Sequence, residues 1–161
     1  MCANTKCWRC VTYSVASATR ADALRRRIGA LLVATSGGIL LCAGAIVAPL
    51  LFAALAPDRS TAGRIAARVF EASYWCAGVA ALAVLIFRVA RSRIDVALGA
   101  GLAGCAVLQL AVIAPAIARH GEGWPLSFAA LHGLAGGLHV AMTLGALVLA
   151  WRLSGEAART R

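Results

Sequence analysis

Four long apolar segments alternate with short polar segments along the chain. The apolar segments are residues 28–55, 69–87, 96–117 and 126–151. Each is long enough to cross about 30 Å of hydrocarbon as an α-helix, and none shows the apolar–polar alternation of a membrane β-strand. Because every backbone polar group inside a membrane has to be satisfied, helices are the remaining solution. The pattern predicts an all-α membrane protein, a four-helix transmembrane bundle.

The polar segments predict the domain organisation. Residues 1–27 form a basic, cysteine-containing extension in which we expect no regular structure, residues 28–151 form the transmembrane domain, and residues 152–161 form a tail. Pro57-Asp58-Arg59-Ser60 breaks the chain between the first two apolar segments. Ser60 or Thr61 is the expected N-cap of the next helix.

Charge predicts the orientation. The net charge of +10 would suit a nucleic-acid-binding protein, but 61% of the residues are hydrophobic and no separate basic domain is present. Twelve of the 16 Lys and Arg residues lie in the N-terminal segment, in residues 88–93 and in the C-terminal tail, and four lie in the two other connections. The positive-inside rule then places both termini in the cytoplasm. The expected partner is the lipid bilayer, and nucleic acid is excluded.

The first and third apolar segments share a local pattern. Ile46-Val47-Ala48-Pro49 and Val112-Ile113-Ala114-Pro115 hold similar places in their segments. Each proline removes one helical hydrogen bond, so Pro49 and Pro115 predict helix kinks. The recurrence favours two parallel helical-hairpin repeats. The alternative is that each proline marks a frayed helix end.

The fourth apolar segment carries the strongest candidate for chemistry. His132, Gly136, His139 and Thr143 recur at helical spacing, and His139 lies at the predicted bilayer midplane. Ionisable groups at that depth usually face the protein interior or a water-filled cavity. The pattern predicts a polar path or ligand site in which histidine carries a proton or binds a metal. The alternative is that these side chains hold helices together by hydrogen bonds worth about 0.6–2 kcal/mol each.

Two further polar side chains match these histidines in depth. Gln109 of the third segment matches His139, and Glu71 of the second matches His132. We expect His139 to face the interior and to contact Gln109, the strongly polar side chain at matching depth on the third segment. For Glu71 the favoured interpretation is an ion pair with Arg68, three residues earlier on the same helix.

Metal and haem chemistry have weaker support. Cys7 and Cys10 have a C-x-x-C spacing but only Cys2 as a third nearby ligand, whereas a closed zinc site takes four. His132 and His139 lie about 10.5 Å apart along one helix, so they cannot both bind one haem iron, and a haem-binding membrane cytochrome is the least favoured interpretation. No nucleophile–base pair, phosphate loop or carboxylate dyad is recognisable. We expect no enzymatic activity and no cofactor.

Short motifs in the apolar segments resemble a known family. They are Ala48-Pro49-x-x-Phe52-x-x-Leu55, Ala62-Gly63-x-Ile65 with Phe70, and Phe128-x-x-Leu131-His132. Over about residues 30–150 the chain resembles four-helix bacterial membrane proteins of unknown function, a family related to the vertebrate transmembrane protein linked to cisplatin resistance. The family pattern has serine and asparagine where this chain has Ala135 and His139, so no role is carried over to those two positions.

The resemblance implies a location in the bacterial inner membrane and points toward export of a metal or a drug. With the polar residues of the fourth segment, it predicts an inner-membrane protein that handles or exports a small solute or a metal. The alternative is a structural or accessory subunit, which associates as a homo-oligomer or with a membrane complex.

Overall fold

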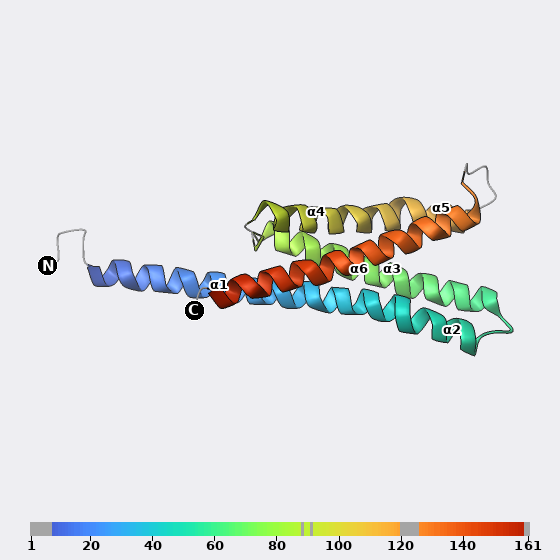
Figure 1. The fold of residues 1–161 in the computed structure, drawn as a ribbon, viewed down its shortest axis with the longest axis horizontal. Helices are drawn as coiled ribbons and strands as arrows, with labels where there is room; N and C mark the ends of the chain where they lie inside the picture. Colours follow the sequence, from blue (N-terminus) through green and yellow to red (C-terminus); the bar gives the residue numbers. More distant parts are fainter. Residues whose placement is uncertain (1–7, 88, 91, 120–125, 160–161) are drawn as a thin grey trace.

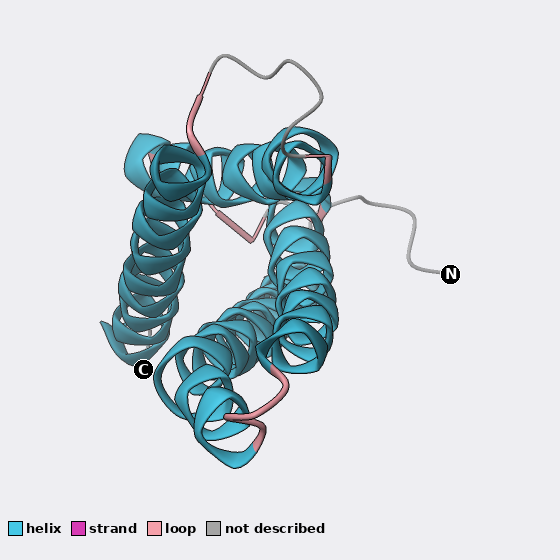
Figure 2. Ribbon diagram, turned by 90° about the vertical axis from the view of Figure 1, so that its right-hand side faces the viewer, coloured by secondary structure: helices cyan, strands magenta, loops and turns pink. Residues whose placement is uncertain are grey.

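The computed structural model describes residues 8–87, 89–90, 92–119 and 126–159, with side chains from Arg20 to Gly155. These residues form helices and short connections, without a strand (Figure 2). In chain order the helices are α1 (Trp8–Cys42), π-helical segment η1 (Ala43–Val47), α2 (Ala48–Ala54), α3 (Arg59–Ile86), α4 (Arg93–Leu108), π-helical segment η2 (Gln109–Ile113), α5 (Ala114–Ala118) and α6 (Phe128–Arg159).

Four stretches of the described chain are long and apolar enough to cross a membrane. They are Arg20–Ala54, Arg59–Ile86, Arg93–Ala118 and Phe128–Gly155. They lie side by side as a bundle, with the early turns of α1 reaching past one end (Figure 1). The prediction of an all-α, four-helix membrane protein is confirmed. We call the end that holds Arg25, the α3–α4 connection and the last turns of α6 the basic end, and the other the opposite end.

Helix α1 begins much earlier than expected. It runs from Trp8, whereas the sequence predicted no regular structure before residue 28. The prediction is wrong for residues 8–27, because this segment contains neither glycine nor proline and nothing in it ends a helix. Cys2 and Cys7 lie outside the described residues, as does the side chain of Cys10.

The bundle is apolar outside and holds its polar side chains inside. Large apolar side chains such as Leu31, Val79 and Trp151 are more than half exposed, as expected for residues that face lipid. Alanine is the commonest residue in the core, and α1 packs most extensively against α6. The buried polar side chains among the described residues are Ser36, Ser73, Asp95, Gln109, His139 and Thr143.

A π-helical turn directly precedes each of the two prolines. The Ala48 N–H donates to the Ala43 carbonyl in η1, and the Ala114 N–H donates to the Gln109 carbonyl in η2. Each bond spans five residues instead of four, and Pro49 and Pro115 then occupy the first turn of the next α-helix. Such turns widen the helix and are frequent at functional sites. The π-helical turns precede the proline in both the first and the third spans, which supports the predicted repeat of two helical hairpins.

Helix α3 begins with a side-chain cap. The Asp58 carboxylate accepts a hydrogen bond from the Thr61 N–H at 3.0 Å and one from the Ser60 hydroxyl at 2.8 Å. Hydrogen bonding from Thr61, and then from Ser60, lowers the pKa of Asp58 from 3.8 to about 2. The prediction of Ser60 or Thr61 as N-cap was therefore wrong, because Asp58 caps the Thr61 N–H and the helix begins at Arg59, which places Ser60 and Thr61 within its first turn.

Candidate functional site around His139

His139 of α6 lies buried against α1. Its Nε2 lies 3.0 Å from the Leu40 carbonyl oxygen. A carbonyl only accepts, so Nε2 carries the hydrogen and the neutral ring keeps a lone pair on Nδ1. That nitrogen is buried and has no hydrogen-bond partner among the residues that the structure describes. The site therefore contains one fixed nitrogen and one unpaired basic nitrogen.

Two aromatic rings of α3 enclose the imidazole. The ring centroids of Phe70 and His139 lie 5.1 Å apart at 86°, and those of Tyr74 and His139 lie 5.8 Å apart at 68°. Both are edge-to-face arrangements, which aromatic pairs favour. The imidazole is therefore held between α1, α3 and α6.

A glycine in η1 makes room for the ring. A Cβ atom added to Gly44 would lie 2.7 Å from His139 Nε2, closer than real Cβ contacts. Gly44 follows Leu40 by one helical turn, so the notch and the accepting carbonyl lie next to each other on the same helix face. The absence of a side chain at residue 44 therefore permits the hydrogen bond of His139.

Gln109 binds α6 at a different point from the one predicted. It is buried, and its Nε2 donates to the Ala135 carbonyl at 2.8 Å. We predicted His139 as its partner, but the hydrogen bond that the structure shows for the imidazole goes to Leu40. Nearby, the Thr143 hydroxyl donates to the His139 carbonyl at 2.9 Å. Gln109 therefore ties the third span to α6 one turn before the histidine, whereas the Thr143 bond lies within α6.

The structure does not bring the two histidines together. His132 is exposed, and its ring lies 4.4 Å from that of Phe128, whereas His139 is buried. Between Phe128 and Leu138 only Leu131 is buried, and the other buried residues of α6 that the structure describes lie from His139 onward. The helical spacing predicted one interior face, but this segment has few neighbours to cover that face. Glu71 pairs with Arg68 at 2.8 Å, as favoured.

Metal ligation finds little support in this part of the chain. Across residues 20–155, apart from the undescribed positions, His, Cys, Asp and Glu form no group of three that could hold an ion. His132 and His139 have the separate surroundings given above. Cys7 and Cys10, the other weak metal candidates, lie outside the described side chains.

A second polar cluster, missed by sequence reasoning, lies at the basic end. Arg152 of α6 donates through Nε to Asp95 Oδ1 at 2.6 Å, and through Nη2 to the Ser92 hydroxyl at 3.2 Å. Asp95 is fully buried, and its N–H donates to the Ser92 hydroxyl. The pattern Ser92-x-x-Asp95 before an apolar run is a helix-start signal that could have been recognised. The pairing with Arg152 has no comparable signal.

These features define an all-α, multi-pass membrane protein. The chain belongs to a family described as a domain of unknown function, DUF4149, which matches residues 31–123, more than half of the chain. This agrees with the resemblance to an uncharacterised family. The match ends before α6 begins and does not include His132 or His139. No curated protein and no solved structure matches the chain.

Proposed function

We propose that this protein handles a small solute in the bacterial inner membrane and that His139 is its proton-accepting group. The observation that carries the proposal is the buried, unpaired Nδ1 of His139. A buried acceptor without a donor costs about 1–3 kcal/mol. Such a cost at the centre of a membrane bundle is typical of groups that bind a proton or a ligand.

The surroundings favour a proton over a metal ion. A bound metal needs three or more protein ligands, whereas a proton needs the one nitrogen that the site offers. The groups that contact the ring are the Leu40 carbonyl from α1 and the Phe70 and Tyr74 rings from α3. Tyr74 is the titratable one among them. Protonation of Nδ1 would introduce a buried charge there, which favours separation of α6 from α1 and α3.

The direction of transport that we propose is export. The motifs in the apolar segments resemble the relatives of the vertebrate transmembrane protein linked to cisplatin resistance, and that resemblance supports export of a small solute. The excess of Lys and Arg at the basic end supports a cytoplasmic location for both termini. We propose no covalent step, so the role is binding and passage and not catalysis.

Proton flux into liposomes tests the proposal. Full-length protein is reconstituted around an internal pH dye, an acid pulse is applied outside, and the rate of acidification is measured. His139→Phe keeps an aromatic ring next to Phe70 and Tyr74, and we expect it to reduce the flux to that of protein-free liposomes. His132→Phe, the same change at an exposed position of the same helix, should retain the flux. Equal flux in the two variants would contradict the proposal.

A second candidate, an accessory subunit, is favoured by the open face of α6. Gly133 and Gly137 form a small-xxx-small pair, and a Cβ added at either would meet nothing within 4 Å. Such pairs allow close approach of another membrane helix. Gly133→Leu with Gly137→Leu should then abolish self-association or co-purification of a partner, while His139→Phe should leave it intact. Under the first candidate, His139→Phe should abolish the proton flux, while Gly133→Leu with Gly137→Leu should leave the flux intact.

A further inference from the structure

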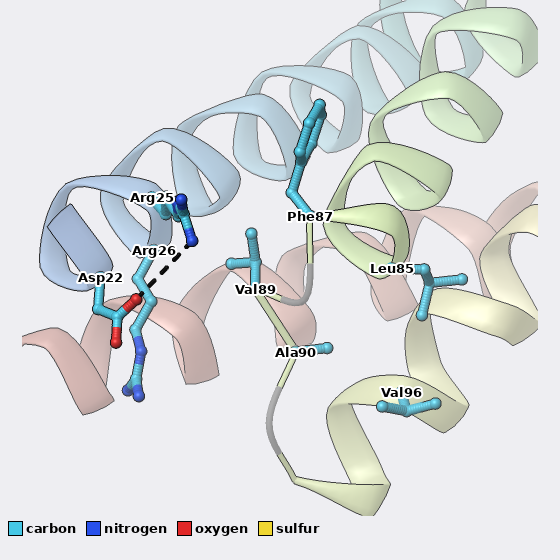
Figure 3. Close-up of a pocket in the computed structure, with 8 residues that line it drawn as sticks. All are labelled: Asp22, Arg25, Arg26, Leu85, Phe87, Val89, Ala90 and Val96. Carbon is cyan, nitrogen blue, oxygen red and sulfur yellow. Dashed lines mark ion pairs between the residues drawn. The ribbon is translucent and has the colours of Figure 1, made fainter. Parts of the chain in front are cut away.

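Two adjoining cavities lie at the basic end, between α1 and the α3–α4 connection. The larger, of about 810 Å³, has a charged rim on α1 formed by Asp22, Arg25 and Arg26. Val89 and Ala90 of the connection face these residues (Figure 3). The smaller, of about 220 Å³, shares Arg25, Phe87 and Val89 with the larger one. The remaining residues that line it are Ile28, Gly29, Leu32, Ala83 and Val84.

The two cavities differ in chemistry. Arg25 and Arg26 directly precede the apolar run that begins at Ile28, which places them at the level of the lipid headgroups. Apart from Arg25, the smaller cavity is lined by apolar residues alone. From Arg25 to Leu32 it follows α1 for seven residues, about 10 Å along the helix axis. A charged mouth thus opens into an apolar slot that runs toward the membrane interior.

The mouth is suited to an anion. Asp22 and Arg25 pair at 4.0 Å with both side chains well exposed, 43% and 65%. Exposed pairs of this kind contribute little, so a phosphate can compete for the Arg25 guanidinium, which binds it through two N–H groups. Of the charged residues that the structure describes around the mouth, two are arginines and one is an aspartate.

The slot has a defined wall. A Cβ added to Gly29 would lie 2.8 Å from Cγ1 of Val89. Val89 is buried, and its N–H donates to the Val84 carbonyl at 3.0 Å. Val89 is therefore seated directly on α1 at Gly29 and forms one wall of the slot.

We propose that this site binds one anionic phospholipid, with its phosphate at Arg25 and Arg26 and one acyl chain in the slot along Ile28 and Ala83. A free phosphate would use the mouth but not the apolar slot, and a zwitterionic lipid such as phosphatidylcholine would bring its phosphate together with a cation that the two arginines repel. Basic pockets between membrane helices are known to hold anionic headgroups. The inference does not depend on the role of His139 or on the orientation of the chain, because either leaflet can supply such a lipid.

Native mass spectrometry of the full-length protein with dioleoylphosphatidylglycerol or dioleoylphosphatidylcholine tests this site. We expect one phosphatidylglycerol to bind about tenfold to thirtyfold more tightly than phosphatidylcholine, at about 1 kcal/mol for each arginine. Arg25→Gln with Arg26→Gln should remove the preference. The matched control is Arg20→Gln with Arg93→Gln, which removes the same charge from exposed positions near the basic end that do not line the cavities, and it should keep the preference.

A second variant tests the slot separately from the charge. Ala83→Phe fills the slot and should weaken binding of both lipids, while Ala72→Phe, on an exposed position of the same helix, should not. Circular dichroism establishes that each variant retains its helices. If the double arginine variant does not fold, Ala83→Phe still tests the site, because it leaves both arginines in place. The proposal would be overturned if the two double arginine variants lost the preference for phosphatidylglycerol equally. It would also be overturned if inorganic phosphate, at the same concentration as the lipid, displaced the phosphatidylglycerol completely.

Discussion

Arg152 donates to Asp95 at 2.6 Å and thereby joins the last turns of α6 to the first turn of α4. The two partners differ in exposure, because Asp95 is fully buried whereas the side chain of Arg152 is 30% exposed. Removal of Arg152 therefore leaves a buried charge without its partner. Removal of Asp95 leaves a cation that reaches water.

This asymmetry predicts unequal costs for the two alanine variants. Arg152→Ala should lower the free energy of unfolding by about 3–5 kcal/mol, as expected for a broken buried pair. Asp95→Ala should cost less, about 1.5–3 kcal/mol, the value of hydrogen bonds to a charged group. Unfolding by denaturing detergent, followed by circular dichroism, measures both. A larger loss for Asp95→Ala would contradict the buried position of the carboxylate.

The notch at Gly44 makes a second prediction. In Gly44→Ala the new Cβ meets Nε2 of His139, so the ring has to move away from the Leu40 carbonyl, and the bundle should lose about 1–3 kcal/mol of stability. Gly38 lies in the same stretch, where an added Cβ meets nothing within 4 Å. Gly38→Ala should therefore stabilise by about 0.5–1 kcal/mol. The thermal midpoints of the two variants, measured in one detergent, make the comparison. Equal shifts of the midpoint from that of wild type would contradict a close contact between Gly44 and His139.

The cap of α3 predicts a pH dependence at the opposite end. Hydrogen bonding from Thr61 and Ser60 lowers the pKa of Asp58 from 3.8 to about 2. Because the folded value is the lower one, the stabilisation is fully present above the ordinary pKa and disappears as the pH falls through about 2. Asp58→Asn keeps a capping oxygen without this titration. The thermal midpoints of wild type and Asp58→Asn should therefore converge between about pH 4 and pH 2, and a constant difference would exclude the cap as the cause.

Orientation can be tested by thiol labelling. In a background without the native cysteines, a membrane-impermeant maleimide should label Ser60→Cys and Ser127→Cys from outside the cell, because both positions are exposed at the opposite end, Ser60 in the first turn of α3 and Ser127 directly before α6. Ser154→Cys, exposed near the end of α6, should be labelled only after the membrane is opened. Labelling of Ser154→Cys from outside the cell would contradict the proposed cytoplasmic location of the C-terminus.

The sequence was sufficient for the four helices because their apolar segments have lengths that the bilayer dictates. It was not sufficient for the site. The partner of His139 is a backbone carbonyl in α1, and any residue at position 40 would present one. The ion pair of Asp95 with Arg152 joins residues that each had a local explanation, a helix start and the positive-inside rule, so neither demanded a partner. The exposed position of His132 depends on how far α6 projects from the bundle, which helical spacing does not specify.

Nitrogen NMR of histidine in liposomes tests the assignment of His139 most directly. With ¹⁵N-labelled histidine, and with His120→Phe and His132→Phe so that His139 is the one labelled residue, each ring nitrogen reports whether it carries a hydrogen. Our account predicts that the neutral His139 ring is protonated at Nε2 and bare at Nδ1, and that Nδ1 gains a proton as the pH is lowered while the protein stays folded. A neutral ring protonated at Nδ1, or one that takes up no proton at any pH at which the protein stays folded, would contradict it.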